Sequence, residues 1–329
     1  MQTGPAHAGA ERHAFDSSLH STRASARGGT SCGGRACSEG ACGEVAAHGA
    51  DGLGEAPWIE APPRWTLRVL DECRRLPARL LAALPLAARL AWREWRLRAS
   101  PWLLCAPVLL VFAHAAVLAL VFGAGDLVSR PALAAQRLAA GALLFSILQH
   151  GLARGATALV DERALVSRRA FPLEALILRP VLAQAASAGL GLALLAGWSA
   201  FDGVLGPRAL WLVLVVAGFA LFVSALALLL AILHARRRAA AEALAWGLPL
   251  ATLATPVWWD PAWIGAGAWL REAMAVNPLA AYLGLARSSL GLAHFEAGAL
   301  ACACAWTACI AGAALLVLAW RRPHLCDEV

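Results

Sequence analysis

Residues 209–234 read ALWLVLVVAGFALFVSALALLLAILH, an apolar run that contains no Asp, Glu or Arg. About 20 apolar residues in a helix are enough to cross the hydrocarbon core of a bilayer. Three arginines, Arg236–Arg238, follow the run almost at once, as is typical of the cytoplasmic flank of a membrane span. The stretch therefore predicts a membrane-spanning helix.

The composition of the whole chain agrees with this run. Of the 329 residues, 60% are hydrophobic and 15% are charged, whereas a soluble domain carries about 25% charged residues. All 28 basic residues are arginine, and the net charge is +7. Without lysine the chain can form neither a Walker-type P-loop nor a Schiff base. The composition argues against a soluble enzyme, and arginine in cytoplasmic loops explains the basic balance without nucleic acid.

Six apolar runs predict an all-α, polytopic membrane protein with six transmembrane helices, at residues 101–123, 133–152, 173–198, 209–234, 239–257 and 297–320. Most arginines fall before the first run or after the second, fourth and sixth. The alternate segments hold only Arg130, Arg137, Arg208, Arg271 and Arg287. Because arginine accumulates in cytoplasmic loops, both termini are predicted to be cytoplasmic, with residues 323–329 as a short C-terminal tail.

The first 60 residues differ from the rest of the chain. They are rich in Gly, Ala and Ser without apolar periodicity, so residues 1–60 are predicted to be a disordered, low-complexity tail. Three cysteines recur there at five-residue intervals, at Cys32, Cys37 and Cys42. A metal site is one interpretation, but no C-x-x-C pair is present, and the pattern favours a plain tail.

Residues 61–100 are amphipathic. One helical face is apolar and the opposite face carries arginines, at Arg75, Arg79, Arg89, Arg93 and Arg96. The pattern predicts an N-terminal amphipathic helix region that lies in the cytoplasmic interface of the membrane; a solvated cytosolic helix is the alternative. Pro77 and Pro85 are expected to divide the segment into shorter helices.

The ionisable and sulfur-containing residues of the spans form no recognisable catalytic set. His114 and His150 have no acidic partner three or four residues away, which favours packing or interhelical hydrogen bonding. Cys302, Cys304 and Cys309 lie among Ala and Gly, as expected of small packing residues. No G-x-S-x-G or H-E-x-x-H motif occurs. We therefore predict that the chain is not an enzyme and holds no metal or cofactor of its own.

The third predicted span and the loop before it carry two further signals. Small residues in the span predict close helix contacts, at Ala185, Ser187, Gly189, Gly191 and Gly197, while Arg179 either snorkels or faces a polar conduit. Residues 154–170 alternate charged and apolar, which predicts a short cytoplasmic helix that an external motor protein could grip; an ordinary loop helix fits equally. The candidate docking residues are Asp161, Glu162, Arg163, Arg168, Arg169, Phe171 and Pro172.

Aromatic residues gather in the segment between the last two predicted spans, at Trp258, Trp259, Trp263, Trp269 and Tyr282. They form either an interfacial aromatic belt or a surface on which sugar rings stack as a glycan leaves the membrane.

Four separated segments together resemble the ABC-2-type permeases that export polysaccharides such as O-antigen, capsule or teichoic acid. The matching residues are, in chain order, Trp102 and Pro107 in the first span, Arg168, Arg169, Phe171, Pro172 and Glu174 before the third, Thr255, Pro256 and Val257 after the fifth, and Asn277, Pro278, Leu279, Arg287 and Gly291 before the sixth. The resemblance covers residues 65–322, and residues 101–322 would form the six-span permease domain.

The resemblance implies a half-transporter of a bacterial cytoplasmic (inner) membrane. Two copies would form the pore, and separate P-loop ATPase chains would bind ATP and Mg and dock at residues 161–172. The cargo would be a lipid-linked polysaccharide, for example a lipopolysaccharide precursor, drawn from among the membrane lipids. Two alternatives remain: an ABC-2-type permease for a drug or lipid, and an intramembrane enzyme of cell-envelope synthesis.

The arginine distribution predicts the orientation. A reporter that works only in the cytoplasm should be active when fused after Arg238 or Arg322, and silent when placed at Gly203 or Trp263, because arginine-rich loops stay inside. Activity measurements on the four fusions test this, and the reverse pattern would refute the six-span topology.

Overall fold

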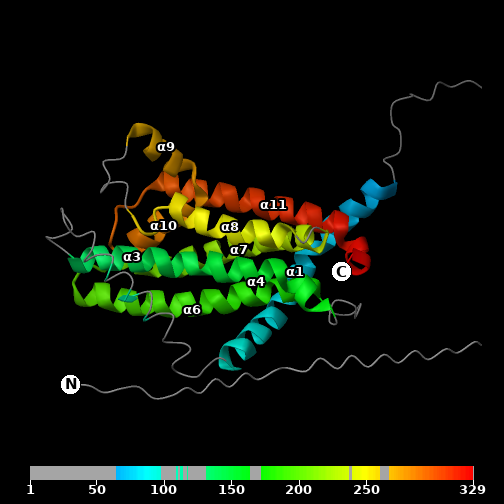
Figure 1. The fold of residues 1–329 in the computed structure, drawn as a ribbon, viewed down its shortest axis with the longest axis horizontal. Coiled ribbons are helices and arrows are strands. Elements are labelled where there is room, and N and C mark those ends of the chain that lie inside the picture. Colours follow the sequence, from blue (N-terminus) through cyan, green and yellow to red (C-terminus); the bar gives the residue numbers. More distant parts are fainter. Residues whose placement is uncertain are drawn as a thin grey trace, which may run out of the picture. The chain divides into compact units, whose positions relative to one another are not determined.

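The computed structural model describes residues 64–97, 109, 112–113, 117, 131–163, 172–236, 239–259 and 267–328 (Figure 1). Within these ranges every regular element is helical and no strand occurs, which confirms the all-α part of the prediction. The predicted tail, residues 1–60, and nearly all of the first predicted span lie outside the described residues.

The helices follow one another in the order α1 (Arg64–Leu97), α3 (Pro131–Ser146), a π-helical segment (Ile147–Leu152), α4 (Ala153–Asp161), α6 (Leu173–Phe201), a 3-10 turn (Pro207–Leu210), α7 (Trp211–Arg236), α8 (Ala239–Ala254), α9 (Ala268–Val276), α10 (Pro278–Ser289) and α11 (Ala297–Glu328). Helices α3 and α4 follow each other end to end, and this long stretch runs side by side with α6, α7, α8 and α11, with α9 and α10 at one end of the bundle (Figure 1). Helix α1 packs on α6 and α11.

Four stretches of the described chain are long and apolar enough to cross a membrane: Ala132–Asp161, Leu173–Phe201, Pro207–Arg236 and Ala297–Arg321. They correspond to the second, third, fourth and sixth predicted spans and support a membrane protein. The fifth predicted span forms the 16-residue helix α8, which at 1.5 Å per residue is about 24 Å long, shorter than a hydrocarbon core of about 30 Å. A total of six spans stays a prediction.

The candidate span Ala132–Asp161 is longer than the second predicted span, residues 133–152. The sequence pattern placed a separate cytoplasmic helix at residues 154–170, but α3, the π-helical segment and α4 continue without a break to Asp161. The separate helix is therefore wrong for residues 154–161, while residues 164–170 lie outside the described residues. The physical reason is burial, because Gly155, Ala156, Ala158 and Leu159 all face the neighbouring helices.

Two glycines allow α4 and the π-helical segment to approach α6 and α7 closely. A Cβ atom added to Gly151 would lie 3.2 Å from the Cα of Val181, and one added to Gly155 would lie 2.9 Å from the Cβ of Ala227. These glycines are four residues apart, the spacing at which small residues let membrane helices meet.

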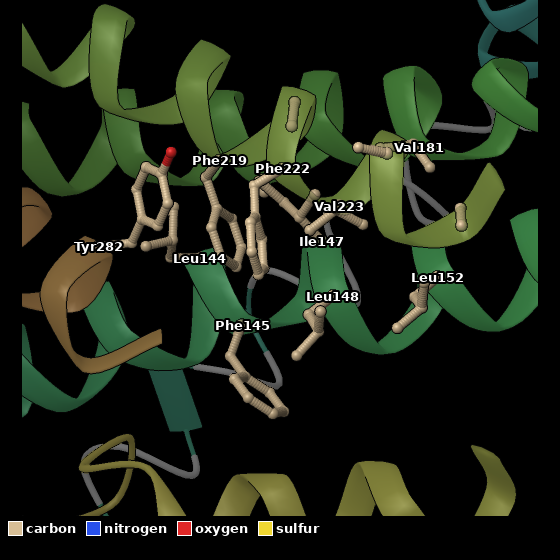
Figure 2. Packing of buried hydrophobic residues seen from close by; sticks show 14 of the residues in the cluster. Leu144, Phe145, Ile147, Leu148, Leu152, Val181, Phe219, Phe222, Val223 and Tyr282 are labelled. Carbon is tan, nitrogen blue, oxygen red and sulfur yellow. The ribbon is translucent and has the colours of Figure 1, made fainter. Parts of the chain in front are cut away.

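Aromatic rings fill the core between α7 and α10. The ring centroid of Phe219 lies 5.0 Å from that of Tyr282 and 6.2 Å from that of Phe222. Figure 2 shows these three side chains next to Leu144 and Ile147 of the candidate span Ala132–Asp161. Because apolar contacts of this kind are numerous and individually weak, they fix the relative positions of the three elements collectively.

Helix α1 is continuous, so the expectation that Pro77 and Pro85 would divide it is wrong. Each proline removes one backbone hydrogen bond, but the helix gains tertiary contacts along one face, where Leu76, Ala83 and Ala87 are buried. An ion pair of 2.9 Å between Arg79 and Glu72 also bridges the turn that contains Pro77. The interfacial location of α1 stays a prediction.

The small residues of α6 are divided between two environments. A Cβ atom on Gly191 would lie 2.6 Å from a methyl carbon of Leu143, so the predicted close contact is present there. For Gly189 and Gly197, no described atom comes within 4 Å of such a Cβ. Only part of the predicted small-residue face is thus used inside the described chain.

The close approach of Gly155 to Ala227 leads to a prediction about the stability of the protein. Replacing Gly155 by Leu should lower the free energy of unfolding by about 1–3 kcal/mol, because the new side chain cannot fit against Ala227. The same substitution at Gly247 of α8, where no described atom would lie within 4 Å of the Cβ, should cost much less. Unfolding of the two purified variants in mixed micelles measures this; equal losses would contradict it.

Candidate functional site

Three helices are joined by charges where α1 ends. Glu94 lies in the last turn of α1, with one carboxylate oxygen 2.6 Å from Nη2 of Arg154 in α4 and the other 3.2 Å from Nε of Arg179 in α6. Arg179 also donates from Nη2 to Glu162, just after α4, at 2.5 Å. We call Glu94, Arg154, Arg179 and Glu162 the ionic network.

The ionic network alternates acid and base, and it is only partly open to solvent. The side chain of Glu94 is 14% exposed and that of Arg179 is 24% exposed. Opposite charges at such sites attract more strongly than they do in water. From the sequence, Arg179 could either snorkel or face a polar conduit. In the structure it lies between two carboxylates and ties α6 to both α1 and the end of α4.

A row of polar side chains follows one face of the candidate span Ala132–Asp161. Ser146, His150, Arg154, Thr157 and Asp161 recur every three or four residues, the spacing that places them on one side of a helix. All five are exposed or half-buried, whereas Leu148, Leu152 and Leu159 on other faces are buried. We call this row the polar stripe.

Polar contacts join two pairs of residues within the polar stripe. The hydroxyl of Thr157 donates to Oδ2 of Asp161 at 2.6 Å, and Nδ1 of His150 lies 3.3 Å from the carbonyl oxygen of Ser146. At the far end, the amide of Gln184 in α6 donates to the hydroxyl of Ser146 at 3.2 Å. The stripe is thus continuous with polar groups of α6.

The polar stripe reaches far into an apolar segment. At 1.5 Å per residue, Ser146 lies about 22 Å from Asp161, roughly halfway along the candidate span Ala132–Asp161. Polar groups in a membrane are costly, and they almost always face protein or a water-filled cavity. The π-helical segment Ile147–Leu152 carries His150, and π-helical turns are frequent at functional sites. The stripe is therefore the strongest candidate for a functional surface.

Three of the predicted docking residues lie in or beside the polar stripe and the ionic network. Asp161 belongs to the polar stripe, Glu162 to the ionic network, and Arg163 is exposed beside them. Pro172 immediately precedes α6 as its N-cap residue. Arg168, Arg169 and Phe171 lie outside the described residues.

Two of the family-like segments meet where α10 packs against α3. Arg287 is 7% exposed and donates from Nη2 to the carbonyl oxygen of Pro256 at 2.8 Å, and from Nε to that of Arg137 at 3.2 Å. A Cβ atom on Gly141 would lie 3.0 Å from the carbonyl oxygen of Val257, so a larger residue would displace this turn. The buried guanidinium therefore holds the Thr255–Val257 turn against α3.

The remaining family-like positions have local structural roles. Asn277 caps α10 by accepting a hydrogen bond from the backbone N–H of Leu279 at 2.9 Å, with Pro278 in the first turn. This is the usual chemistry of a helix start. Glu174 is 1% exposed in the first turn of α6. Trp102 and Pro107 lie outside the described residues.

The predicted glycan-path aromatics have different environments. Tyr282 is 4% exposed and its hydroxyl lies 2.7 Å from that of Thr307, so it belongs to the core shown in Figure 2; burial raises the pKa of its phenol. Trp258 packs against the core, and Trp259 donates to the carbonyl oxygen of Leu253 at 3.0 Å. Trp269 of α9 is 73% exposed. Trp263 lies outside the described residues.

The cysteines of α11 form no metal-binding site within the described part of the chain. Cys302 is half-buried, and Cys304 and Cys309 are exposed along α11. Within the described part of the chain, no group of three His, Cys, Asp or Glu side chains is placed to hold a metal ion. His114 and the cysteines at 32, 37 and 42 lie outside the described residues.

The sequence analysis missed the polar stripe and Glu94. The spacing of Ser146, His150 and Arg154 was a usable signal, but a span ending at Leu152 separated the first two residues from the third. For Glu94 no local signal existed, because its partners Arg154 and Arg179 are distant in the sequence.

The ionic network predicts that Glu94 holds the end of α1 on the bundle. Glu94→Gln should raise the rate of tryptic cleavage after Arg89 or Arg93 about fivefold, because losing a partly buried pair worth about 1 kcal/mol increases the detached population. Glu72→Gln is the matched control, since Glu72 pairs with Arg79 inside α1 itself. Equal cleavage rates for the two variants would contradict this role.

Comparison with known proteins identifies no relative: no protein-family model matches the chain, and no curated protein matches it.

Proposed function

We propose that the chain is the membrane-spanning permease subunit of an ATP-driven ABC-2-type exporter that moves a lipid-linked polysaccharide across the cytoplasmic membrane. One observation carries the proposal: the polar stripe runs halfway along a candidate membrane span and is exposed or half-buried in the single chain. A stripe of this kind suits the wall of a path for a polar cargo.

The chemistry of the polar stripe fits a saccharide cargo. Hydroxyl, imidazole and carboxylate groups of Ser146, Thr157, His150 and Asp161 can exchange hydrogen bonds with sugar hydroxyls. Arg154 pairs with Glu94, but its side chain is 42% exposed, so its guanidinium can also donate to a phosphate linkage. In a homodimer whose two stripes face each other, the polar groups would be removed from lipid and the path would be lined from both sides.

The ionic network offers a route by which a motor protein could move this surface. Glu162 directly follows α4 and belongs to the segment 161–172 that is proposed to receive the ATPase. A displacement of this segment would act on Arg179 and, through Glu94, on α1, so three helices would move together. Since the chain has no lysine, the P-loop of such a motor must belong to a separate subunit, which would bind ATP and Mg.

The contact at the opposite end of the bundle also supports the proposed family. The turn at Pro256 and the helix that carries Arg287 are far apart in the sequence, yet the guanidinium bonds directly to the turn. Two segments that resemble family motifs thus form one buried contact. Among the described aromatic residues that were predicted to line the glycan path, Trp269 is the one with a largely exposed ring.

The proposal is tested by removing polarity from the stripe. Deletion of the gene should abolish surface polysaccharide and leave a lipid-linked glycan inside the cell. Restoring the chain with His150→Leu and Thr157→Val should recover less than about a tenth of the surface glycan, because losing several hydrogen bonds of about 1 kcal/mol each slows passage at least tenfold. Quantification of surface and intracellular glycan, with membrane abundance of the chain, measures this.

Thr252→Val is the matched control, because Thr252 of α8 lies outside the stripe and donates only to the carbonyl oxygen of Leu248 in its own helix. It should restore full export. Intact surface glycan in the deletion strain would refute the polysaccharide cargo; altered drug sensitivity or lipid asymmetry would then favour the other ABC-2-type cargoes. Turnover of an envelope precursor by the purified chain without an ATPase would favour the intramembrane enzyme.

A further inference from the structure

A cavity of about 440 Å³ lies among α7, α10 and α11. Its inner wall is largely apolar and includes Val215 and Gly218 of α7, Leu285 of α10, and Leu300 and Ala303 of α11. Leu214, which also lines it, is 66% exposed, so the cavity opens on the outer surface of the bundle. Its size falls within the range of about 300–1,000 Å³ found for small-molecule sites.

The polar groups in the cavity wall already have partners. The hydroxyls of Ser288 and Ser289 donate to the carbonyl oxygen of Leu285 at 2.9 and 2.8 Å. The hydroxyl of Tyr282 pairs with that of Thr307 at 2.7 Å. Since each of these hydroxyls already has a hydrogen-bond partner and the rest of the inner wall is largely apolar, the inner cavity suits a hydrocarbon chain.

The guanidinium group of Arg208 lies at one end of the cavity. The guanidinium carbon of Arg208 lies 5.5 Å from the ring centroid of Phe295, and Trp211 packs edge-on to the same ring at 6.2 Å. Among the described residues, no carboxylate lies within ion-pair distance of Arg208, which is exposed. Arg208 also lies in the first turn of the candidate span Pro207–Arg236, at the level where a membrane interface would begin.

We propose that this cavity binds one acyl chain of an anionic phospholipid, whose phosphate pairs with Arg208. The cavity extends from Trp211 to Gly218, about two helical turns or 10 Å along α7, and this stretch begins three residues after Arg208. An acyl chain gains little by leaving other lipid tails for an apolar wall. Selection therefore comes from the net charge of the head group: its phosphate accepts from the fork of N–H donors of arginine, and an anionic lipid, unlike a zwitterionic one, has no head-group cation that offsets this attraction. This site is independent of the proposed transport function.

The test measures lipid that stays bound to the purified full-length chain. The protein is exposed in detergent to equal amounts of phosphatidylglycerol and phosphatidylcholine with identical acyl chains, separated by gel filtration, and analysed by native mass spectrometry. Wild type should retain phosphatidylglycerol over phosphatidylcholine roughly fivefold, the effect of one interfacial arginine on an anionic lipid. Arg208→Gln should reduce the ratio to about one, whereas Arg271→Gln, an exposed arginine of α9 outside the cavity, should leave it unchanged.

A second pair of variants tests the acyl-chain cavity. Gly218→Leu places a side chain toward Tyr282, in the cavity wall, and should remove both lipids. Gly312→Leu on α11, where no described atom would lie within 4 Å of the Cβ, should retain them. The proposal is overturned by equal retention of the two lipids in wild type, by equal ratios in the two arginine variants, or by normal lipid binding in a monodisperse Gly218→Leu protein.

Discussion

The close approach of the candidate span Ala132–Asp161 to α6 and α7 controls the geometry of this protein. A Cβ atom would be tightly packed at Gly151 and would clash at Gly155, so the two glycines mark the face of the helix that is buried against its neighbours. Burial of one face of a helix leaves the opposite face outward. That outward face carries Ser146, His150, Arg154, Thr157 and Asp161, so the same contact that joins three helices also presents the polar stripe.

The charged side chains at the two ends of the bundle differ in burial and in their hydrogen-bond partners. Where α1 ends, Glu94 and Glu162 alternate with two arginines in a partly exposed network that can rearrange, because such pairs are individually weak. Where α10 packs on α3, Arg287 is buried and bonded to backbone carbonyls. Removing such a group leaves several polar atoms unsatisfied, which costs more. We therefore expect movement at the first end and rigidity at the second.

Tertiary packing overrides local sequence signals at two places in this protein. Pro77 and Pro85 are local helix breakers, but the buried face of α1 outweighs the two lost hydrogen bonds. Tyr282 belongs to an aromatic-rich segment, yet its ring packs on Phe219 in the core. In each case local propensity was interpreted correctly, and packing against another helix decided the outcome.

The sequence by itself determined that the chain is helical and apolar enough for a membrane, because uncharged runs such as residues 209–234 need no partner to be recognised. It also contained the periodic polar residues of the second span, although their common face became clear only with the continuous helix up to Asp161. Only the tertiary structure decided the partners of Glu94, Arg179 and Arg287. The physical reason is that ion pairs and buried hydrogen bonds depend on distances in space, which link residues far apart in the sequence and leave no local pattern.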